Sequence, residues 1–600
     1  MSPIKLLSSR SLSIQTSAQC LLIIAGFSSW SIANHYPPWV GFHNELAGFV
    51  WALAIALYLI IRKPAAHSVR RIHWSGADTI MVMALSIIAL QLSLGLLAYA
   101  DAGLLGVYYL LVGYVINLAC RASLFEDSQF KTLLNTVIWT TFSAGIFAGY
   151  IVLYQLFGLN YLTIFAMDHS STSQLYGNIG QPNHTATLVL IALVCALACY
   201  ERNVIGKACL GVVCTFFLLT IVLVESRTGL LSLFVLMAWW AVSKKRIGLR
   251  LSLSAIVCGA LIYGALLWLA PVLKEWAGSG LVDRDLLRSG QESGRLLAAK
   301  QMLTALKMQW GLGYGFLQVS DAQSAAILSG VSGEKLVENL IYSHNLFFDC
   351  LVWFGIPVGL LITIIAGRTF LLKVLAVQTP LHWALVGCML PILVHSFTEY
   401  PFAYSYFLFP FVFFFSLLER LTSKTEVVSN APPTALKFGL AIRCSICALA
   451  CIGVLITYEY LQLEENHRTA RFNIAKIGKA AVDYEPYKPI LLHLLADLNA
   501  AAFVDTNAGG YAAEDVQMLK KLTTAYPTFW IQARYIRMLI NSGDYELAIR
   551  QISILKGKLA PKYFEGFIQE LPVNGLCNSK ILIPAWFRKC QPKSMQYIYQ

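Results

Sequence analysis

Thirteen apolar stretches divide this chain of 600 residues. A helix that crosses a bilayer needs roughly 20 mostly apolar residues, and hydrocarbon favours helices because it offers backbone groups no other hydrogen-bond partner. Only 13% of the residues are charged, against about 25% in soluble proteins. The sequence therefore predicts an α-helical, multi-pass membrane protein with about 13 spans. The stretches lie at about 18–34, 47–61, 77–95, 103–119, 133–157, 185–199, 208–224, 229–242, 251–270, 346–366, 383–397, 403–418 and 438–458.

The basic residues predict which side of the membrane each loop occupies. With the N-terminus in the cytoplasm, the short inner segments hold 20 Lys and Arg residues, and the short outer segments hold one, Arg227. Short loops rich in Lys and Arg stay in the cytoplasm. This asymmetry accounts for most of the net charge of +13 without a nucleic-acid partner. The odd number of spans predicts that the C-terminal region is outside.

The longest outer loop is predicted to cover residues 271–345. Apolar residues at helical spacing between Arg295 and Trp310 predict an amphipathic helix on the membrane surface, and the glycines after Trp310 are expected to end it. Asp283 and Asp285 have the spacing of a metal-dependent sugar-nucleotide site, but a charged loop segment of this kind is more often solvated. We therefore expect no metal site here.

The tail, residues 459–600, is more polar than the transmembrane domain predicted for 1–458. Stretches 526–541 and 544–555 predict a helical hairpin, with Ala548 where the two helices pack closely. Such a hairpin resembles a tetratricopeptide unit. We therefore expect a helical C-terminal domain.

Twelve of the 14 cysteines lie in or beside apolar spans, where cysteine usually acts as a small buried side chain. The other two, Cys577 and Cys590, lie in the tail. An oxidising compartment would allow these two to pair.

Three polar residues stand near outer span ends. Arg227 lies in Glu225-Ser-Arg-Thr-Gly, and a guanidinium beside hydrocarbon is costly unless it is paired or functional. An ion pair with Glu225, or a side chain that reaches the headgroups, would explain it without a ligand. Gln181 and Asn183 can donate to an anion or a sugar hydroxyl, although their Gly-Gln-Pro-Asn segment is more often a turn and helix start.

A second polar group comes late in the chain. Ser343-His344-Asn345 stands where the long loop re-enters the membrane, and histidine exchanges protons near neutral pH, although a single histidine is more often structural. His395, Glu399 and Tyr400 complete the outer polar set. Phosphate-binding glycine loops, dinucleotide fingerprints and H-E-x-x-H motifs are absent from the sequence, so use of ATP is not indicated.

Taken together, these motifs resemble the O-antigen ligase and polymerase superfamily. Its motifs match Ser226-Arg-Thr-Gly229, Gly294-Arg295, Trp310-Gly-Leu-Gly-Tyr-Gly315 and Ser343-His-Asn345, in this order. Gly180-Gln-Pro-Asn183, Glu399-Tyr-Pro401 and the helical tail most resemble the bacterial protein O-oligosaccharyltransferases that glycosylate pilins. The resemblance covers most of the chain.

The resemblance implies transfer of a preassembled glycan from undecaprenyl pyrophosphate to Ser or Thr of a pilin-like periplasmic protein, at the inner membrane and without a metal or other cofactor. Arg227 and Arg295 would stabilise charge that develops on the pyrophosphate. His344 would accept the proton of the acceptor hydroxyl. The residues expected to bind substrate are Gln181, Asn183, Asn345, Glu399 and Tyr400.

Two classes of alternative remain open, namely a related glycan-transferring enzyme and a transporter. An O-antigen ligase would transfer the glycan to lipid A core sugar, and a polymerase would extend the glycan itself. A transporter or flippase of a lipid-linked or anionic substrate would place ionisable residues near the midplane and contain broken helices, which Pro357 and Pro391 could produce. The polar residues gather at outer span ends instead, which favours the enzyme.

The predicted topology can be tested with reporter fusions. Because of the asymmetry in basic residues, a periplasm-active reporter fused at Ser320 or at Ala513 should be active. A cytoplasmic signal at Ala513 together with a periplasmic signal at Ser320 would show that the late spans have been miscounted.

Overall fold

The computed structural model describes residues 3–60, 68–70, 72–123, 127–168, 174–278, 292–331, 339–423, 427–429, 433–478, 485–506 and 511–572. Two expectations lie outside these residues. They are the acidic pair Asp283 and Asp285 and the tail cysteines Cys577 and Cys590.

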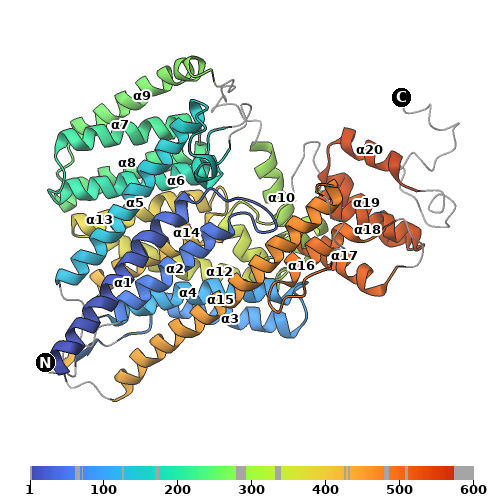
Figure 1. The fold of residues 1–600 in the computed structure, drawn as a ribbon, viewed down its shortest axis with the longest axis horizontal. Coiled ribbons are helices and arrows are strands. Elements are labelled where there is room, and N and C mark those ends of the chain that lie inside the picture. The colour runs from blue at the N-terminus through green and yellow to red at the C-terminus, as the bar shows by residue number, and fades with distance from the viewer. Residues whose placement is uncertain are drawn as a thin grey trace. The chain divides into compact units, whose positions relative to one another are not determined.

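Within the described residues the chain is helical, with twenty α-helices (Figure 1). Nine of these helices are long and apolar enough to cross a membrane. They are α2 (Phe42–Ile60), α3 (Gly76–Ser93), α4 (Ala100–Ala122), α5 (Asp127–Leu156), α6 (Pro182–Glu201), α9 (Leu253–Trp276), α12 (Leu346–Leu375), α14 (Ser405–Thr422) and α15 (Pro433–Ala475).

Four further helices contain the remaining apolar stretches: α1 (Pro3–Ser31), α7 (Lys207–Leu223), α8 (Arg227–Ile247) and α13 (Pro380–Ser396). Each of the thirteen predicted stretches therefore falls in a helix of its own, and the number that cross the bilayer stays a prediction. The other helices are α10 (Glu292–Met308), α11 (Val319–Leu328), α16 (His493–Ala500), α17 (Ala513–Ala525), α18 (Phe529–Asn541), α19 (Tyr545–Lys558) and α20 (Pro561–Glu570). Two short strands, β1 (Ser68–Arg70) and β2 (Val427–Ser429), pair antiparallel.

Several local predictions are confirmed. Helix α10 covers the predicted amphipathic segment and ends before the glycines. Helices α18 and α19 form the predicted hairpin, with Ala548 fully buried. Helix α15 continues to Ala475, beyond the predicted end of the last apolar stretch, because helix-forming Leu, Gln and Glu residues follow that stretch.

The chain divides into two compact units, which are described separately. The first unit contains Met1–Met81, Tyr108–Arg288 and Ile365–Thr457, and the second contains Val82–Val107, Ser289–Ile364 and Tyr458–Gln600. Each unit thus joins segments that are far apart in sequence.

Buried polar side chains connect the helices of the first unit. Arg121 of α4 forms an ion pair with Asp78 of α3 at 2.9 Å, and Tyr114 donates to the same carboxylate. Glu45 of α2 accepts the backbone N–H of Ser405, at the start of α14, at 2.7 Å. Charged groups in a bilayer are costly unless they are paired, so these bonds fix how the helices pack.

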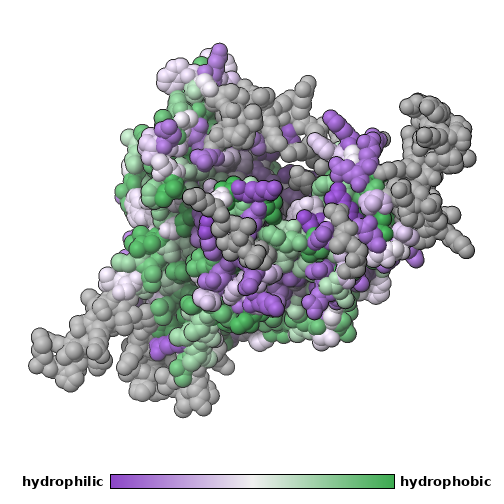
Figure 2. All heavy atoms as spheres, turned by 45° about the vertical axis from the view of Figure 1, so that its right-hand side comes forward, coloured by the Kyte–Doolittle hydropathy of each residue, from purple (hydrophilic) through white to green (hydrophobic). Residues whose placement is uncertain are grey.

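Apolar side chains also face outward from the membrane helices. On α9, Leu261, Trp268 and Trp276 are 69%, 78% and 77% exposed. Figure 2 shows broad hydrophobic areas on the molecular surface. Such areas are unusual on soluble proteins and are expected where lipid covers the protein.

The tail helices of the second unit share an apolar core, which includes the buried Leu519, Ile536 and Ile552. Tyr99 packs into the same core, and its hydroxyl donates to Asp497 at 2.6 Å. Burial and this hydrogen bond raise the pKa of Tyr99 above its usual range, so the hydroxyl remains a donor.

Lys558, the last residue of α19, is a buried basic residue of this unit. It is buried, and its ammonium has no hydrogen-bond partner among the described residues. Burial lowers its pKa from 10.5 to about 7, although Asp321 opposes the shift. Below pH 7 the native and unfolded states both carry the proton, and the native state bears the full cost of the buried charge. Stability should rise as the pH increases from about 7 toward 10.5.

We predict that Lys558→Met stabilises the second unit at neutral and lower pH by about 1–3 kcal/mol, since it removes a buried unpaired donor. The variant should also weaken the increase in stability above pH 7. Melting curves of the full-length protein in detergent, recorded at several pH values, measure both effects. Lys556→Met, which removes an exposed lysine from the same helix, is the control. Equal effects of the two substitutions would contradict the prediction.

Candidate catalytic site

The first part of the site is a turn that leads into α6. A short 3-10 helix, η2 (Gly177–Ile179), precedes Gly180, and Gln181 is the N-cap residue of α6 with Pro182 in its first turn. His35 Nε2 lies 2.7 Å from the Asn178 carbonyl oxygen, and burial lowers the pKa of His35, so the neutral ring can donate to that oxygen. The Gln181 side chain makes no capping bond and is available for a longer-range contact.

That contact is with Glu399, which follows α13. The Gln181 Nε2 donates to Glu399 Oε2 at 2.9 Å, and the Asn183 Nδ2 donates to Glu399 Oε1 at 2.5 Å. Glu399 is buried, with 8% of its surface exposed. A carboxylate can be buried when its oxygens accept hydrogen bonds, and each oxygen here accepts one amide N–H. Three residues predicted from two distant motifs therefore meet.

The same network reaches the start of α8. Ser226 Oγ donates to Asn183 Oδ1 at 2.6 Å and accepts the backbone N–H of Gly229 at 2.8 Å, so Ser226 is the N-cap of α8. Arg227 is the first residue of that helix and is half-buried. Glu225 forms an ion pair with Lys274 of α9. Helices α7 and α8 are therefore two separate helices. The hydrogen bonds of Ser226 cap α8 and so set Arg227 as its first residue.

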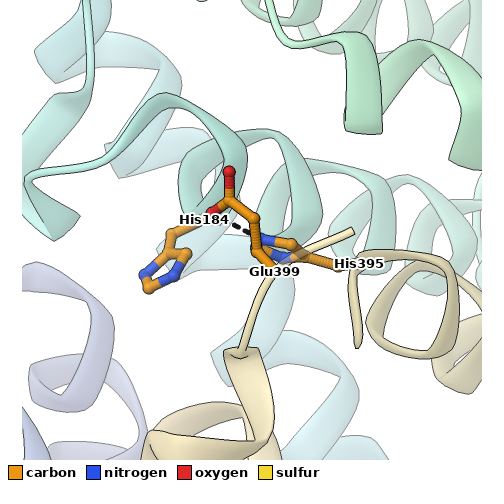
Figure 3. Close-up of side chains that lie close together, drawn as sticks. All are labelled: His184, His395 and Glu399. Atoms are coloured by element: carbon orange, nitrogen blue, oxygen red, sulfur yellow. Dashed lines mark hydrogen bonds and ion pairs between the residues drawn. The ribbon is translucent and has the colours of Figure 1, made fainter. Parts of the chain in front are cut away.

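Two buried histidines lie beside Glu399. Figure 3 shows the His395 ring next to the Glu399 carboxylate, with the His184 ring to one side. His395 Nε2 is 3.5 Å from Glu399 Oε2, and its Nδ1 is 2.9 Å from Thr187 Oγ1. The Thr187 hydroxyl also donates to the Asn183 carbonyl oxygen at 2.9 Å, so Thr187 links His395 to the first turn of α6.

His184, His395 and Glu399 could by composition hold a cation, since one ligand atom of each lies within 4.8 Å of the others. Both oxygens of Glu399 already accept amide N–H groups, however. Each carboxylate oxygen has two lone pairs, so these bonds and a bound cation are chemically compatible.

The second unit contains the other predicted catalytic residues. His344 is partly buried and has a φ of +60°, in the left-handed region that few non-glycine residues adopt. Asn345 Oδ1 accepts the backbone N–H groups of Phe347 and Phe348, so Asn345 caps α12. A capping role for His344 is therefore not needed. Backbone strain of this kind is often found at functional sites.

The Trp-Gly-Leu-Gly-Tyr-Gly motif packs against a break in α12. Gly355 has φ +76° and ψ 164°, which interrupts the helix. The Ile356 N–H donates to the Trp310 carbonyl, and the Tyr314 N–H donates to the Val352 carbonyl, both at 2.8 Å. A Cβ at Gly313 would lie 2.3 Å from the Val352 oxygen. The motif is therefore glycine-rich because two backbones approach closely, and it supports the helix that follows His344.

Gln91 of α3 completes this support. Its amide donates to the carbonyls of Leu312 and Trp353 at 3.0 and 2.7 Å, and its oxygen accepts the Phe316 N–H at 2.9 Å. The side chain is fully buried. One glutamine thus joins the motif to α12 across a long stretch of sequence.

The predicted residues fall into two groups, one in each unit. Gln181, Asn183 and Glu399 are directly hydrogen-bonded, and the Tyr400 ring stacks at 6.1 Å on Tyr404. Arg227 belongs to the same unit. The second unit contains His344 and Asn345, together with Arg295, which is exposed on α10.

Sequence reasoning missed several polar partners. Thr187 contacts His395, Thr398 contacts Thr228, and Asp349 accepts the Ser343 N–H. Ser226, which belongs to a motif but was given no role, donates to Asn183. Thr187 lies four residues after Asn183, one helical turn away, so its position was a usable signal. Nothing local in the sequence indicates the other pairings.

Comparison with known families gives matches along most of the chain. Residues 175–200 match the protein glycosylation ligase family, and residues 210–363 match the O-antigen ligase family. Residues 383–556 match the C-terminal region of the virulence factor membrane-bound polymerase family. These matches include all eight predicted site residues.

Two proteins of Acinetobacter baylyi are similar in sequence. The chain is 22% identical over 565 residues to a general O-oligosaccharyltransferase, which covers 92% of this chain and 94% of that protein. It is 27% identical over 270 residues to a ComP-specific O-oligosaccharyltransferase, which covers 44% of this chain and 47% of that protein.

The helical fold and the nine described helices that are long and apolar enough to cross a membrane define an integral membrane protein. By its motifs and its family matches, the chain is similar to the O-antigen ligase family over residues 210–363 and to the O-oligosaccharyltransferases over most of its length. The resemblance inferred from the motifs is confirmed.

The Ser226 network leads to a stability prediction. Ser226→Ala should remove the cap of α8, at a cost of about 0.5–2 kcal/mol, and deprive Asn183 of a donor, at a further cost of about 1–3 kcal/mol. The matched control is Ser252→Ala, which removes the cap of α9 where the serine is exposed. The melting temperature of the purified protein should fall clearly further for Ser226→Ala. Equal decreases would show that the network adds nothing beyond capping.

Proposed function

We propose that this chain transfers a preassembled oligosaccharide from undecaprenyl pyrophosphate to Ser or Thr hydroxyls of a periplasmic, pilin-like protein. The observation that carries the proposal is the similarity of nearly the whole chain to a general O-oligosaccharyltransferase. The tail, which forms its own apolar core, supports a protein acceptor because such a module could dock a folded protein.

His344 would act as the general base. The acceptor oxygen attacks the anomeric carbon, the bond from that carbon to the pyrophosphate oxygen breaks, and the electron pair leaves with the pyrophosphate. The hydroxyl proton passes to the imidazole, a step that typically contributes 10²–10⁴-fold. The strained backbone at His344 supports this role, since a fixed direction of the ring matters for proton transfer.

Arg227 and Arg295 would bind the pyrophosphate and stabilise its growing charge. The planar guanidinium can bind phosphate oxygens with two parallel hydrogen bonds. With two such cations, the proposed reaction needs no resident metal or other cofactor. The position of Arg227 at the first turn of α8 supports anion binding, since helix N-termini attract negative charge.

Gln181, Asn183, Asn345, Glu399 and Tyr400 would contact the donor or the acceptor. The hydrogen bonds of Glu399 suggest a more specific division of labour. The carboxylate would orient the two amides of Gln181 and Asn183, and these would present fixed polar groups to the substrate. Tyr400, which stacks on Tyr404, would offer an aromatic surface to a sugar ring.

We also propose the finer architecture expected from the sequence. Thirteen spans would cross the inner membrane with the N-terminus in the cytoplasm. Residues 1–458 would form the transmembrane domain and 459–600 a periplasmic, tetratricopeptide-like domain. The separate helices for each apolar stretch and the α18–α19 hairpin support this arrangement.

The function can be tested in a bacterium that lacks its own ligase but makes a lipid-linked glycan. Expression of this chain with a candidate pilin should add the mass of the glycan to the pilin. Because residues 383–556 match a polymerase family, extension of the glycan is a second candidate function. The same cells can distinguish it from transfer to protein. Glycan on lipid A core would indicate a ligase, and longer lipid-linked glycans without a protein product would indicate a polymerase.

His344→Asn is the sharpest test of the catalytic role. Asparagine tolerates the left-handed conformation, so the variant should fold normally while it loses the base. Transfer to the acceptor should fall about 10²–10⁴-fold with unchanged binding of the lipid-linked donor. His493→Asn, which changes a largely exposed histidine of the same unit, is the control. Near-normal transfer by His344→Asn at normal membrane levels would falsify the role.

A further inference from the structure

Asp349 lies in the first turn of α12, and its side chain is fully buried. Its Oδ1 accepts the backbone N–H of Ser343 at 2.7 Å. Its Oδ2 has no hydrogen-bond partner among the described residues. A buried carboxylate is costly, so a single hydrogen bond to a loop residue calls for a specific reason.

The Ser343 bond lies outside ordinary helix capping. Asn345 already accepts the N–H groups of Phe347 and Phe348 and so caps α12. Asp349 instead reaches back beyond the cap to Ser343. The bond therefore closes a short loop from Ser343 to Asp349, and this loop contains His344 and Asn345.

This loop has a second internal bond. Ser343 Oγ donates to the Asn345 carbonyl oxygen at 2.9 Å. Ser343 is thus held at its N–H by the carboxylate and at its hydroxyl by the backbone after His344. A residue in the left-handed region persists when its surroundings determine it, and these two bonds do so at His344.

We infer that Asp349 is a positioning residue for His344. Its hydrogen bond to the Ser343 amide holds the left-handed backbone of His344 and so sets the direction of the imidazole toward the acceptor hydroxyl. The inference rests on the proposed role of His344 as the general base. Asp349 itself does not touch the reacting atoms.

Two substitutions at Asp349 separate the loss of its charge from the loss of its hydrogen-bond acceptor. Asp349→Asn keeps an oxygen that can accept the Ser343 N–H, whereas Asp349→Ala removes the acceptor. In the full-length protein with the undecaprenyl-pyrophosphate glycan and a pilin acceptor, Asp349→Ala should lower kcat about 10²-fold, because a small misplacement of a catalytic group has effects of this size. The KM for the donor should change less than about 3-fold, and Asp349→Asn should keep kcat within about 5-fold of the wild type.

Glu45 provides a matched control in the other unit. It is also a buried carboxylate that accepts a backbone N–H near a helix start, that of Ser405 at 2.7 Å. Glu45→Ala should lower the melting temperature at least as much as Asp349→Ala. Its kcat should nevertheless stay within about 3-fold of the wild type, since Glu45 does not hold the loop of His344.

A double variant tests whether Asp349 acts through His344. In the His344→Asn background, measured over long incubations, Asp349→Ala should lower the residual rate no further. An equal additional loss would overturn the inference, as would an unchanged kcat in Asp349→Ala or an equally large loss in Asp349→Asn. If His344→Asn itself transfers glycan at the normal rate, the proposed function of His344 fails, whatever the Asp349 variants show.

Discussion

Hydrocarbon offers no hydrogen bonds, so a polar group inside a membrane protein is costly unless it finds a partner within the chain. This requirement governs both units. Arg121 pairs with Asp78 in the first, and Gln91 uses both its amide nitrogen and its oxygen in the second. Each such bond joins segments that are distant in sequence. The polar residues that are costly in isolation therefore determine how the apolar helices are arranged.

The same requirement explains why the site motifs contain the residues they do. The break at Gly355 leaves backbone groups of α12 without helical partners, and the glycine-rich segment after α10 supplies partners to them. The supported positions, Val352 and Ile356, lie in the helix that follows His344, whose own loop is closed by Asp349. The glycines that the sequence predicts to end a helix thus also form a close contact between two backbones.

The proposed glycan transfer from a lipid pyrophosphate depends on cations and a base that are held in fixed positions before the reaction begins. In the first unit, Glu399 orders two amides, and the network continues to the cap of the helix that begins with Arg227. In the second unit, two side chains and a cap fix the backbone at His344. Hydrogen bonds therefore hold Gln181, Asn183 and Glu399 in the first unit and the loop of His344 in the second, as the proposed stabilisation of charge in the transition state would require.

The sequence by itself determined the helical class, the place of each apolar helix, the α18–α19 hairpin and the resemblance to known families, because hydrophobic length and short motifs are local properties. It also named Gln181, Asn183 and Glu399, but as separate outer-side residues. Only the tertiary structure decided that one carboxylate binds both amides, that Ser226 links them to α8, and that Asp349 reaches back to Ser343. These pairings depend on how helices pack, and packing is set by contacts between distant segments that no local pattern records.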